Sequence, residues 1–253
     1  MEESNVKQLR EASMLSRLEL SGIEGVGRFK DFPAKHFFTT AQQAGNPYSW
    51  PAKVKTVTIL PENSDKILFA PCYCRESQGV ACDGIFSAHR GVALVLYAAD
   101  CLPILMSANN YPFIGLVHAG WRGTNLEIAR KAAQLVPKYY PVEAEDIFVA
   151  IGPGIHKCCY DDEELANQLV LDERWRPFVT NGALGSRIDL LDFNIQQLLS
   201  AGIKREHIVA ASECACCAKD RNGNYLFFSH HRAKLTGESE GRFAAVIFND
   251  LRI

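Results

Sequence analysis

The chain has 253 residues, is 47% apolar and 22% charged, and carries a formal net charge of −2. This composition predicts a globular protein with a sizeable core. The net charge lacks the excess of basic residues typical of a nucleic-acid-binding protein. The apolar runs are also shorter than the roughly 20 residues that span a membrane. The charged opening segment lacks the apolar block of a secretory signal, so we expect a cytoplasmic protein with neither membrane nor nucleic acid as a partner.

The first third of the chain predicts a helix followed by short strands. Leucine and methionine recur at helical spacing over Asn5–Leu20, and the glycines that follow end this predicted helix. β-Branched and aromatic residues then predict three strands. These strands cover Lys35–Thr40, Val54–Leu60 and Lys66–Ala70. The cysteine-rich segment Cys72–Cys82 predicts a loop.

Two apolar runs in the middle of the chain end in reactive residues. Val92–Ala98 and Phe113–Val117 are short, continuous and bounded by turn residues, which predicts buried strands. Ala-Asp-Cys-Leu-Pro (99–103) follows the first run, and His-Ala-Gly-Trp-Arg-Gly (118–123) follows the second. Polar side chains at the exit of a buried strand are held rigidly and can face a cleft. The first candidates for a functional site are Asp100, Cys101, His118 and Arg122.

The rest of the chain alternates predicted helices and strands. The predicted helices are Asn125–Leu135, with Thr124 as its cap and Glu127 completing a capping pair, Asp161–Leu171, and Leu190–Ala201. The predicted strands are Ile147–Ile151, Ile208–Ala211, Tyr225–Ser229 and Phe243–Phe248. Since no repeat and no linker divides the sequence, residues 1–253 predict a single α/β domain.

Nine cysteines are a high and odd number for a chain of this length. In a reducing compartment they are thiols or metal ligands rather than disulfides. They fall into four groups: Cys72, Cys74 and Cys82; Cys101; Cys158 and Cys159; and Cys214, Cys216 and Cys217. None of the groups has the paired C-x2-C arrangement of a zinc ribbon, so most of them are interpreted as small buried hydrophobic residues.

A thiol and an imidazole at neighbouring strand ends permit two kinds of chemistry. In the first, His118 activates Cys101 as a thiolate nucleophile. In the second, both residues bind zinc or copper, which activates a water or a substrate oxygen. A catalytic zinc has three protein ligands and an open position, so the second alternative requires another ligand.

Four motifs in chain order resemble one family. They are Ala-Asp-Cys-Leu-Pro (99–103), His-Ala-Gly-Trp-Arg-Gly (118–123), Ile-Gly-Pro-Gly-Ile-His-Lys-Cys-Cys-Tyr (151–160), and Phe-Phe-Ser-His-His-Arg (227–232) with Thr-Gly (236–237) and Gly-Arg (241–242) after it. Together they are similar to the laccase-domain family, once described as polyphenol oxidoreductases and now regarded as multifunctional purine nucleoside enzymes. The resemblance runs in register over residues 83–253, and residues 1–82 diverge from it.

The resemblance implies a fold, an activity and a cofactor. The fold is a single α/β domain with mixed β-sheets flanked by helices, related to deamidating bacterial toxins. The activity is phosphorolysis of adenosine, inosine, guanosine or methylthioadenosine with inorganic phosphate as co-substrate, joined by deamination of adenosine. The metal is zinc, with copper as the alternative, bound by one cysteine and two histidines, of which Cys101 and His118 are the matched positions. Copper-dependent polyphenol oxidation is the older assignment and stays open.

The chain departs from the family at the third metal ligand. The family's other histidine lies in a Gln-Val-His-Gly motif, whereas this chain has no histidine between His36 and His89, and Asn63 falls nearest the expected position. Three interpretations follow. The third ligand is Cys72, Cys74 or His89; or the thiol and imidazole work without metal; or the site is degenerate and the chain is a binding protein.

Phosphorolysis also requires an anion site and a group that assists the leaving purine. Arg122 and Arg232 are the candidates for phosphate, because a guanidinium holds phosphate through two parallel hydrogen bonds. Asp100 orients a ligand, stabilises the leaving purine or caps a strand end. His230 and His231 are interpreted as polar groups at a strand end. The expected partner is a small nucleoside, and the sequence predicts no oligomeric state.

Overall fold

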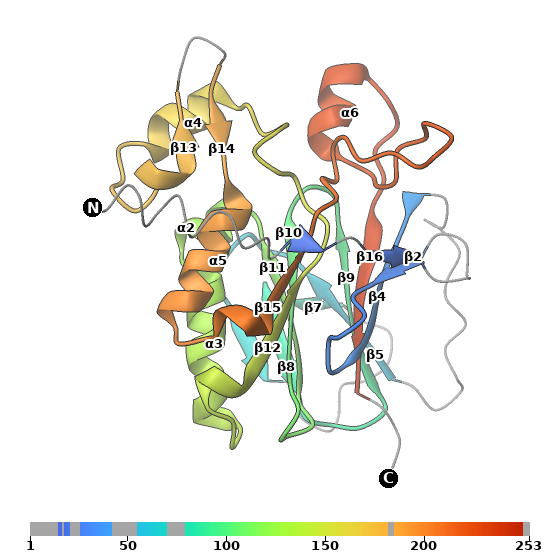
Figure 1. Cartoon of the computed structure of the whole chain (residues 1–253), viewed down its shortest axis with the longest axis vertical. Coiled ribbons are helices and arrows are strands. Elements are labelled where there is room, and N and C mark those ends of the chain that lie inside the picture. Colours follow the sequence, from blue (N-terminus) through green and yellow to red (C-terminus); the bar gives the residue numbers. More distant parts are fainter. Residues whose placement is uncertain are drawn as a thin grey trace.

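The computed structural model of the chain describes residues 15–16, 18–20, 26–41, 55–69, 79–181 and 185–249. Within these residues two seven-stranded mixed sheets stack on each other, and helices cover the outer face of the first sheet (Figure 1). The predicted class, an α/β fold with mixed sheets flanked by helices, is confirmed. No helix of the described residues is long and apolar enough to cross a membrane.

The first sheet has the order β1-β15-β12-β10-β11-β8-β6, and its central strand β10 runs antiparallel to both neighbours. Its strands are β1 (Leu15–Ser16), β6 (Ile67–Phe69), β8 (Gly84–Ser87), β10 (Leu102–Ala108), β11 (Ile114–Ala119), β12 (Ile147–Ile151) and β15 (Ile208–Ala211). The second sheet has the order β2-β3-β4-β16-β9-β5-β7. Its strands are β2 (Glu19–Leu20), β3 (Val26–Arg28), β4 (Lys35–Thr39), β5 (Lys55–Leu60), β7 (Val80–Ala81), β9 (Val92–Ala98) and β16 (Phe243–Phe248).

Within the described residues the α-helices all lie after residue 120. They are α2 (Trp121–Asn125), α3 (Ile128–Tyr139), α4 (Glu163–Leu169), α5 (Leu190–Ser200) and α6 (His230–Thr236), with 3-10 turns at η2 (Ala144–Asp146), η3 (Arg176–Phe178) and η4 (Arg205–His207). A two-stranded ribbon of β13 (Val179–Thr180) and β14 (Arg187–Ile188) joins α4 and α5. The predictions for β4, β5, β6, β9, β11, β12, β15, β16, α4 and α5 are confirmed to within one or two residues at most ends.

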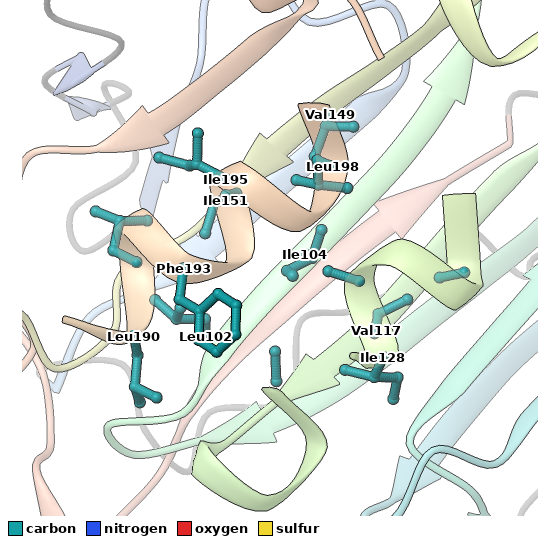
Figure 2. Packing of buried hydrophobic residues seen from close by; sticks show 14 of the residues in the cluster. Leu102, Ile104, Val117, Ile128, Val149, Ile151, Leu190, Phe193, Ile195 and Leu198 are labelled. Atoms are coloured by element: carbon teal, nitrogen blue, oxygen red, sulfur yellow. The ribbon is translucent and has the colours of Figure 1, made fainter. Parts of the chain in front are cut away.

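Strand β10 is buried on both faces and so divides the core in two. Leu102 and Ile104 pack against Phe193 and Leu198 of α5, as Figure 2 shows. Leu105 points the other way, into the apolar layer between the two sheets. Side chains alternate across a strand, so a continuous apolar run satisfies both layers.

The sequence prediction does not include this strand, because Pro103 belongs to the motif that follows the apolar run Val92–Ala98. The proline is the second residue of β10, a place at the beginning of a strand where its missing N–H is tolerated. The consequence for the site is direct. Cys101 follows a strand of the second sheet and precedes one of the first, and β10 rather than β9 is the neighbour of β11.

The helix predicted over Asn5–Leu20 is wrong where the structure describes it. Leu15–Ser16 pairs in parallel with β15, and Glu19–Leu20 pairs with β3. Residues 5–14 and 17 lie outside the described residues. Helical spacing of leucines is a weak signal when sheet edges offer backbone partners, and here the tertiary pairing overrides it.

Two predictions after residue 120 need correction. The helix predicted over Asn125–Leu135 is largely confirmed by α3, but its beginning differs: α2 ends at Asn125, and Glu127 adopts a left-handed conformation (φ 58°) before α3 begins without a side-chain cap. Thr124 caps nothing, because its hydroxyl accepts a hydrogen bond from Asn194 Nδ2 at 2.8 Å. Residues 225–229 form no strand beyond one isolated bridge, since Ser229 caps helix α6 by accepting from Arg232 N at 3.1 Å.

Candidate functional site

Cys101 and His118 meet at the edge of the first sheet. Strands β10 and β11 pair with Leu102 opposite Ala119 and Pro103 opposite His118, which places Cys101 just beyond the end of the pairing and beside Gly120. A Cβ added to Gly120 would lie 2.9 Å from Cys101 Sγ and 3.7 Å from both His118 Cε1 and Asn63 Oδ1. Three side chains from distant parts of the chain therefore surround one glycine.

His118 is held by a buried carboxylate. Its Nδ1 donates to Asp83 Oδ1 at 2.9 Å, and both side chains are almost completely shielded from solvent. Burial lowers the pKa of His118, but hydrogen bonds with Asp83 and Cys101 outweigh it and raise the pKa to about 9. His118 is therefore an imidazolium at neutral pH, with Nε2 as the ring nitrogen that Asp83 does not engage.

Asp83 is fixed by the turn that follows β5. The backbone N–H groups of Glu62, Asn63 and Ser64 donate to its two oxygens at 2.9–3.1 Å, and the Ser64 hydroxyl donates at 2.8 Å. Burial raises the pKa of Asp83, yet the bonds from His118 and Ser64 outweigh this and keep the pKa below its usual value. A carboxylate that orients an imidazole in this way fixes its tautomer and its direction.

Sequence reasoning did not find Asp83. The carboxylate precedes the short strand β8 and lies 35 positions before its histidine, so no motif spacing joins them. The one available signal was a lone acid directly before an apolar run, which a buried strand tolerates only with partners.

Asn63, which the family resemblance puts nearest the expected histidine, lies beside Cys101 and His118. It adopts a left-handed backbone conformation (φ 56°), and its amide oxygen faces the same glycine as the thiol and the imidazole. Of the other ligand candidates, Cys72 and Cys74 lie outside the described residues. His89 is not in the site, because it follows the end of β8 that is opposite to Asp83.

Asp100 lies in a strained conformation beside the pair. Its φ is 81°, and it is buried, with Oδ2 accepting from the backbone N of His231 at 2.7 Å. Its other oxygen, Oδ1, is buried and has no hydrogen-bond partner among the described residues. Non-glycine residues in this region of φ cluster at functional sites. Asp100 therefore anchors the first turn of α6 and keeps an acceptor available.

The two arginine candidates have different environments. Arg122 is exposed and lies over the Trp121 ring at 4.4 Å. Arg232 is buried, and four of its N–H bonds go to Glu238, Ala215, Cys216 and Phe227. Its surroundings argue against the predicted phosphate role, because its donors are committed to holding the loop before α6.

Tyr160 and His231 lie near the same edge. Burial, and after it the charges of Asp162, Cys101 and Asp100, raise the pKa of Tyr160 above its usual value. His231 pairs with Asp161 through Nε2 at 2.9 Å and meets the Tyr160 ring edge-on. His231 thus belongs to the first turn of a helix rather than to a strand end, and His230 instead pairs with Glu240 at 2.9 Å.

The fold is shared with solved structures. A crystal structure of YlmD from Geobacillus stearothermophilus matches with a TM-score of 0.74 and 26% identity, over 93% of this chain and all of that one. The Bacillus licheniformis hypothetical protein YfiH matches with a TM-score of 0.75 and 23% identity, over 91% of this chain and 98% of that one. The half-buried thiol and the buried imidazole and carboxylate therefore lie on the YlmD/YfiH type of α/β fold.

The family assignment follows from a match over most of the chain. Residues 38–250 match the family described as multi-copper polyphenol oxidoreductase laccase, and the chain belongs to this family. The protein named purine nucleoside phosphorylase YlmD of G. stearothermophilus is 37% identical over 169 residues, which is 65% of this chain and 59% of that protein. A Bacteroides thetaiotaomicron protein named purine nucleoside phosphorylase is 28% identical over 195 residues, or 72% of this chain and 66% of that protein. The chain thus spans about three fifths of the first of these curated relatives.

Proposed function

We propose that this chain catalyses the phosphorolysis of a purine nucleoside, with Asp83, His118 and Cys101 as its reacting cluster. The observation that carries the proposal is the imidazolium of His118, held between a buried carboxylate and a thiol. The names of the relatives, which are purine nucleoside phosphorylases, support this class of reaction.

The proposed chemistry assigns one proton transfer to His118. An oxygen of inorganic phosphate attacks C1′ of the ribose, the C1′–N9 bond breaks, and its electron pair passes to the purine. His118 donates its Nε2 proton to the leaving purine, and the acidic proton that the new phosphate monoester releases returns to His118 through solvent. Asp83 stabilises the imidazolium through Nδ1 without itself taking the proton. The products are the free base and ribose 1-phosphate.

Arg122 is the proposed phosphate ligand. Its guanidinium is exposed, and its charge reaches the site, because it lowers the pKa of Tyr160 against the other influences on that phenol. Stacking on Trp121 limits its freedom, which reduces the entropy that binding must remove. Deamination of adenosine and the choice among the four nucleosides stay predictions.

The described residues do not complete a catalytic metal site. Cys101 and His118 are good ligands for zinc or copper, but the third side chain at Gly120 is the neutral amide of Asn63, and no further histidine, cysteine or carboxylate joins this group among the described residues. A catalytic zinc uses three such ligands. Metal binding by Cys101 and His118 stays a prediction, and no step of the proposed reaction passes through a metal.

Release of free base from inosine tests the proposal. The wild-type protein is expected to release hypoxanthine in phosphate buffer and not in sulfate buffer, and the Cys101→Ala and His118→Gln proteins are expected to lose this release. The Cys82→Ala protein is a matched control, because its thiol is buried and faces the Val80 carbonyl. Undiminished phosphorolysis by both site variants contradicts the proposal.

A non-enzymatic binding protein is the second candidate, and Asn63 is the observation that favours it. The family resemblance implies a metal-ligating histidine near this position, and a neutral amide there is expected if the metal-dependent activity has been lost. This candidate predicts binding of a nucleoside in calorimetry with no turnover of adenosine, inosine, guanosine or methylthioadenosine. Phenol oxidation assayed with added copper, in the same preparations, tests the polyphenol oxidase alternative.

A further inference from the structure

Four cysteine sulfurs gather outside the proposed reacting cluster. The sulfur atoms of Cys158, Cys159, Cys214 and Cys217, which we call the four-cysteine cluster, all lie within 4.8 Å of one another. Cys158 Sγ is 3.7 Å from Cys159 Sγ and 3.8 Å from Cys217 Sγ. All four thiols are reduced, because these separations far exceed the bond of about 2.05 Å in a disulfide.

The backbone, rather than chance contact, brings the two halves of the cluster together. Cys158 and Cys159 lie in the turn after β12, and Cys214 and Cys217 lie in the turn after β15. Gly154 forms a bridge with Cys214, and Ala215 N donates to the Gly154 carbonyl at 2.8 Å. The sulfurs are therefore held near one another before any ligand arrives.

Each turn is also closed within itself. Cys159 N donates to the His156 carbonyl at 3.0 Å, and Ala218 N donates to the Cys214 carbonyl at 2.9 Å. In addition, His156 N donates to Cys214 Sγ at 3.3 Å, and an N–H directed at sulfur stabilises a thiolate. Such donors to the ligating atoms are a regular feature of metal sites.

The spacing of the sulfurs matches a tetrahedral metal ion. With Zn–S bonds of about 2.3 Å, the edge of a zinc tetrathiolate tetrahedron is about 3.8 Å. The two sulfur separations given above equal this edge, and the outer limit of 4.8 Å requires a contraction of roughly 1 Å at most. Four sulfur donors in tetrahedral arrangement select zinc over the harder cations.

Access and chemistry agree with this geometry. Cys158 and Cys217 are exposed, whereas Cys214 is buried and Cys159 half-buried, so a cation can enter from one side and be enclosed on the other. Cys158 and Cys217 are exposed and so fall outside the interpretation of most cysteines as small buried hydrophobic residues. Cys214 and Cys217 have the C-x2-C spacing found in zinc sites, a signal that sequence reasoning passed over because only one such pair is present.

We propose that the four-cysteine cluster binds one Zn²⁺ as a closed structural site, separate from Cys101 and His118. The ion ties the turn after β12 to the turn after β15. The first turn continues from Ile155, whose N–H donates to the Asp100 carbonyl at 2.7 Å, and the second supplies the Cys216 carbonyl that Arg232 binds at 2.7 Å. The zinc therefore stabilises the two segments that position Asp100 and helix α6.

Zinc analysis of the Cys101→Ala protein tests the proposal, because this variant lacks the thiol of the other site. Reduced protein is loaded with Zn²⁺ and dialysed. Elemental analysis by inductively coupled plasma mass spectrometry is then expected to find one zinc per chain. X-ray absorption at the zinc edge is expected to show four sulfur neighbours at about 2.3 Å. Absence of retained zinc, or a shell dominated by nitrogen and oxygen, overturns the proposal.

Variants of the cluster give the matched comparison. Adding Cys158→Ser and Cys217→Ser to Cys101→Ala, which we call the cluster variant, is expected to remove the retained zinc, whereas adding Cys82→Ser is expected to keep it. Both substituted cluster residues are exposed, so the backbone contacts around them stay intact. Retention of the zinc by a folded cluster variant overturns the proposal. The absorption measurement decides the matter if the cluster variant fails to fold.

Discussion

Replacing Asp83 with asparagine tests the ion pair that controls His118. The carboxylate accepts from the His118 ring, from three backbone N–H groups and from the Ser64 hydroxyl. Asparagine keeps the size of the side chain but removes its charge and turns one acceptor into a donor, which then faces other donors. A buried donor without an acceptor destabilises the folded state by the full free-energy cost of removing that donor from water.

The magnitude follows from the pKa of His118. A folded-state pKa of about 9 against the ordinary 6.5 corresponds to about 3 kcal/mol of stabilisation, which Asp83 and Cys101 supply together. Loss of one partner of a buried ion pair costs about 3–5 kcal/mol of stability. This estimate and the one from the pKa therefore agree in order of magnitude. Because the pKa of this histidine is raised in the folded state, the stabilisation is complete below pH 6.5 and disappears as the pH rises through 9.

Urea unfolding at two pH values measures this effect. The Asp83→Asn protein is expected to be about 3–5 kcal/mol less stable than the wild type near pH 6, with the part that comes from His118 ionisation gone near pH 10. Asp146→Asn, at a partly exposed carboxylate that bonds Asn110, is the matched control. A change below about 0.5 kcal/mol near pH 6, or titration of His118 near 6.5 in the wild-type protein, refutes the reasoning.

Three further substitutions test individual placements. The Asn63→His substitution is made in a protein that keeps Cys101 and carries Cys158→Ser and Cys217→Ser. It is expected to raise the zinc affinity about tenfold or more, because the new histidine completes a set of three ligands. Unchanged zinc affinity in calorimetry contradicts the position given to Asn63. Arg232→Gln is expected to cost about 3 kcal/mol of stability or more, whereas Arg122→Gln is expected to leave unfolding unchanged and to raise the KM for phosphate. An unchanged stability of the Arg232→Gln protein together with a destabilised Arg122→Gln protein contradicts both assignments. Ser229→Ala is expected to cost about 1 kcal/mol in urea unfolding by removing the cap of α6, and an unchanged midpoint argues against that cap.

The sequence carried most of the strand order but little of the pairing. Apolar runs such as Val92–Ala98 can be recognised as strands in the sequence, because most of their side chains are buried and few positions accept a polar residue. Pairing depends on contacts between distant segments, which is why the strand character of Leu15–Ser16 and the division between the two sheets were not predictable. The strand predicted over Tyr225–Ser229 is wrong for another reason. Ser229 caps helix α6, and this cap outweighs the strand propensity of the segment.

The sequence motifs identified the candidate reacting residues Cys101 and His118, whereas only the structure identified Asp83 as the partner of His118. Cys101 and His118 were found because they follow apolar runs, and the structure places them together. Asp83 was not found, since a buried carboxylate that serves another side chain leaves no local pattern. The four-cysteine cluster was missed for the same reason, because its two halves meet only through the bridge between Gly154 and Cys214.

Phosphorus NMR of the reaction mixture, combined with chromatography of the purine and the free sugar in the same mixture, tests the central claim most directly. Wild-type protein incubated with inosine and inorganic phosphate is expected to produce ribose 1-phosphate and hypoxanthine in equal amounts, and the His118→Gln protein is expected to produce neither above background. Formation of hypoxanthine with free ribose, or sugar phosphate formation by the His118→Gln protein at the wild-type rate, contradicts phosphorolysis at the Asp83–His118–Cys101 cluster.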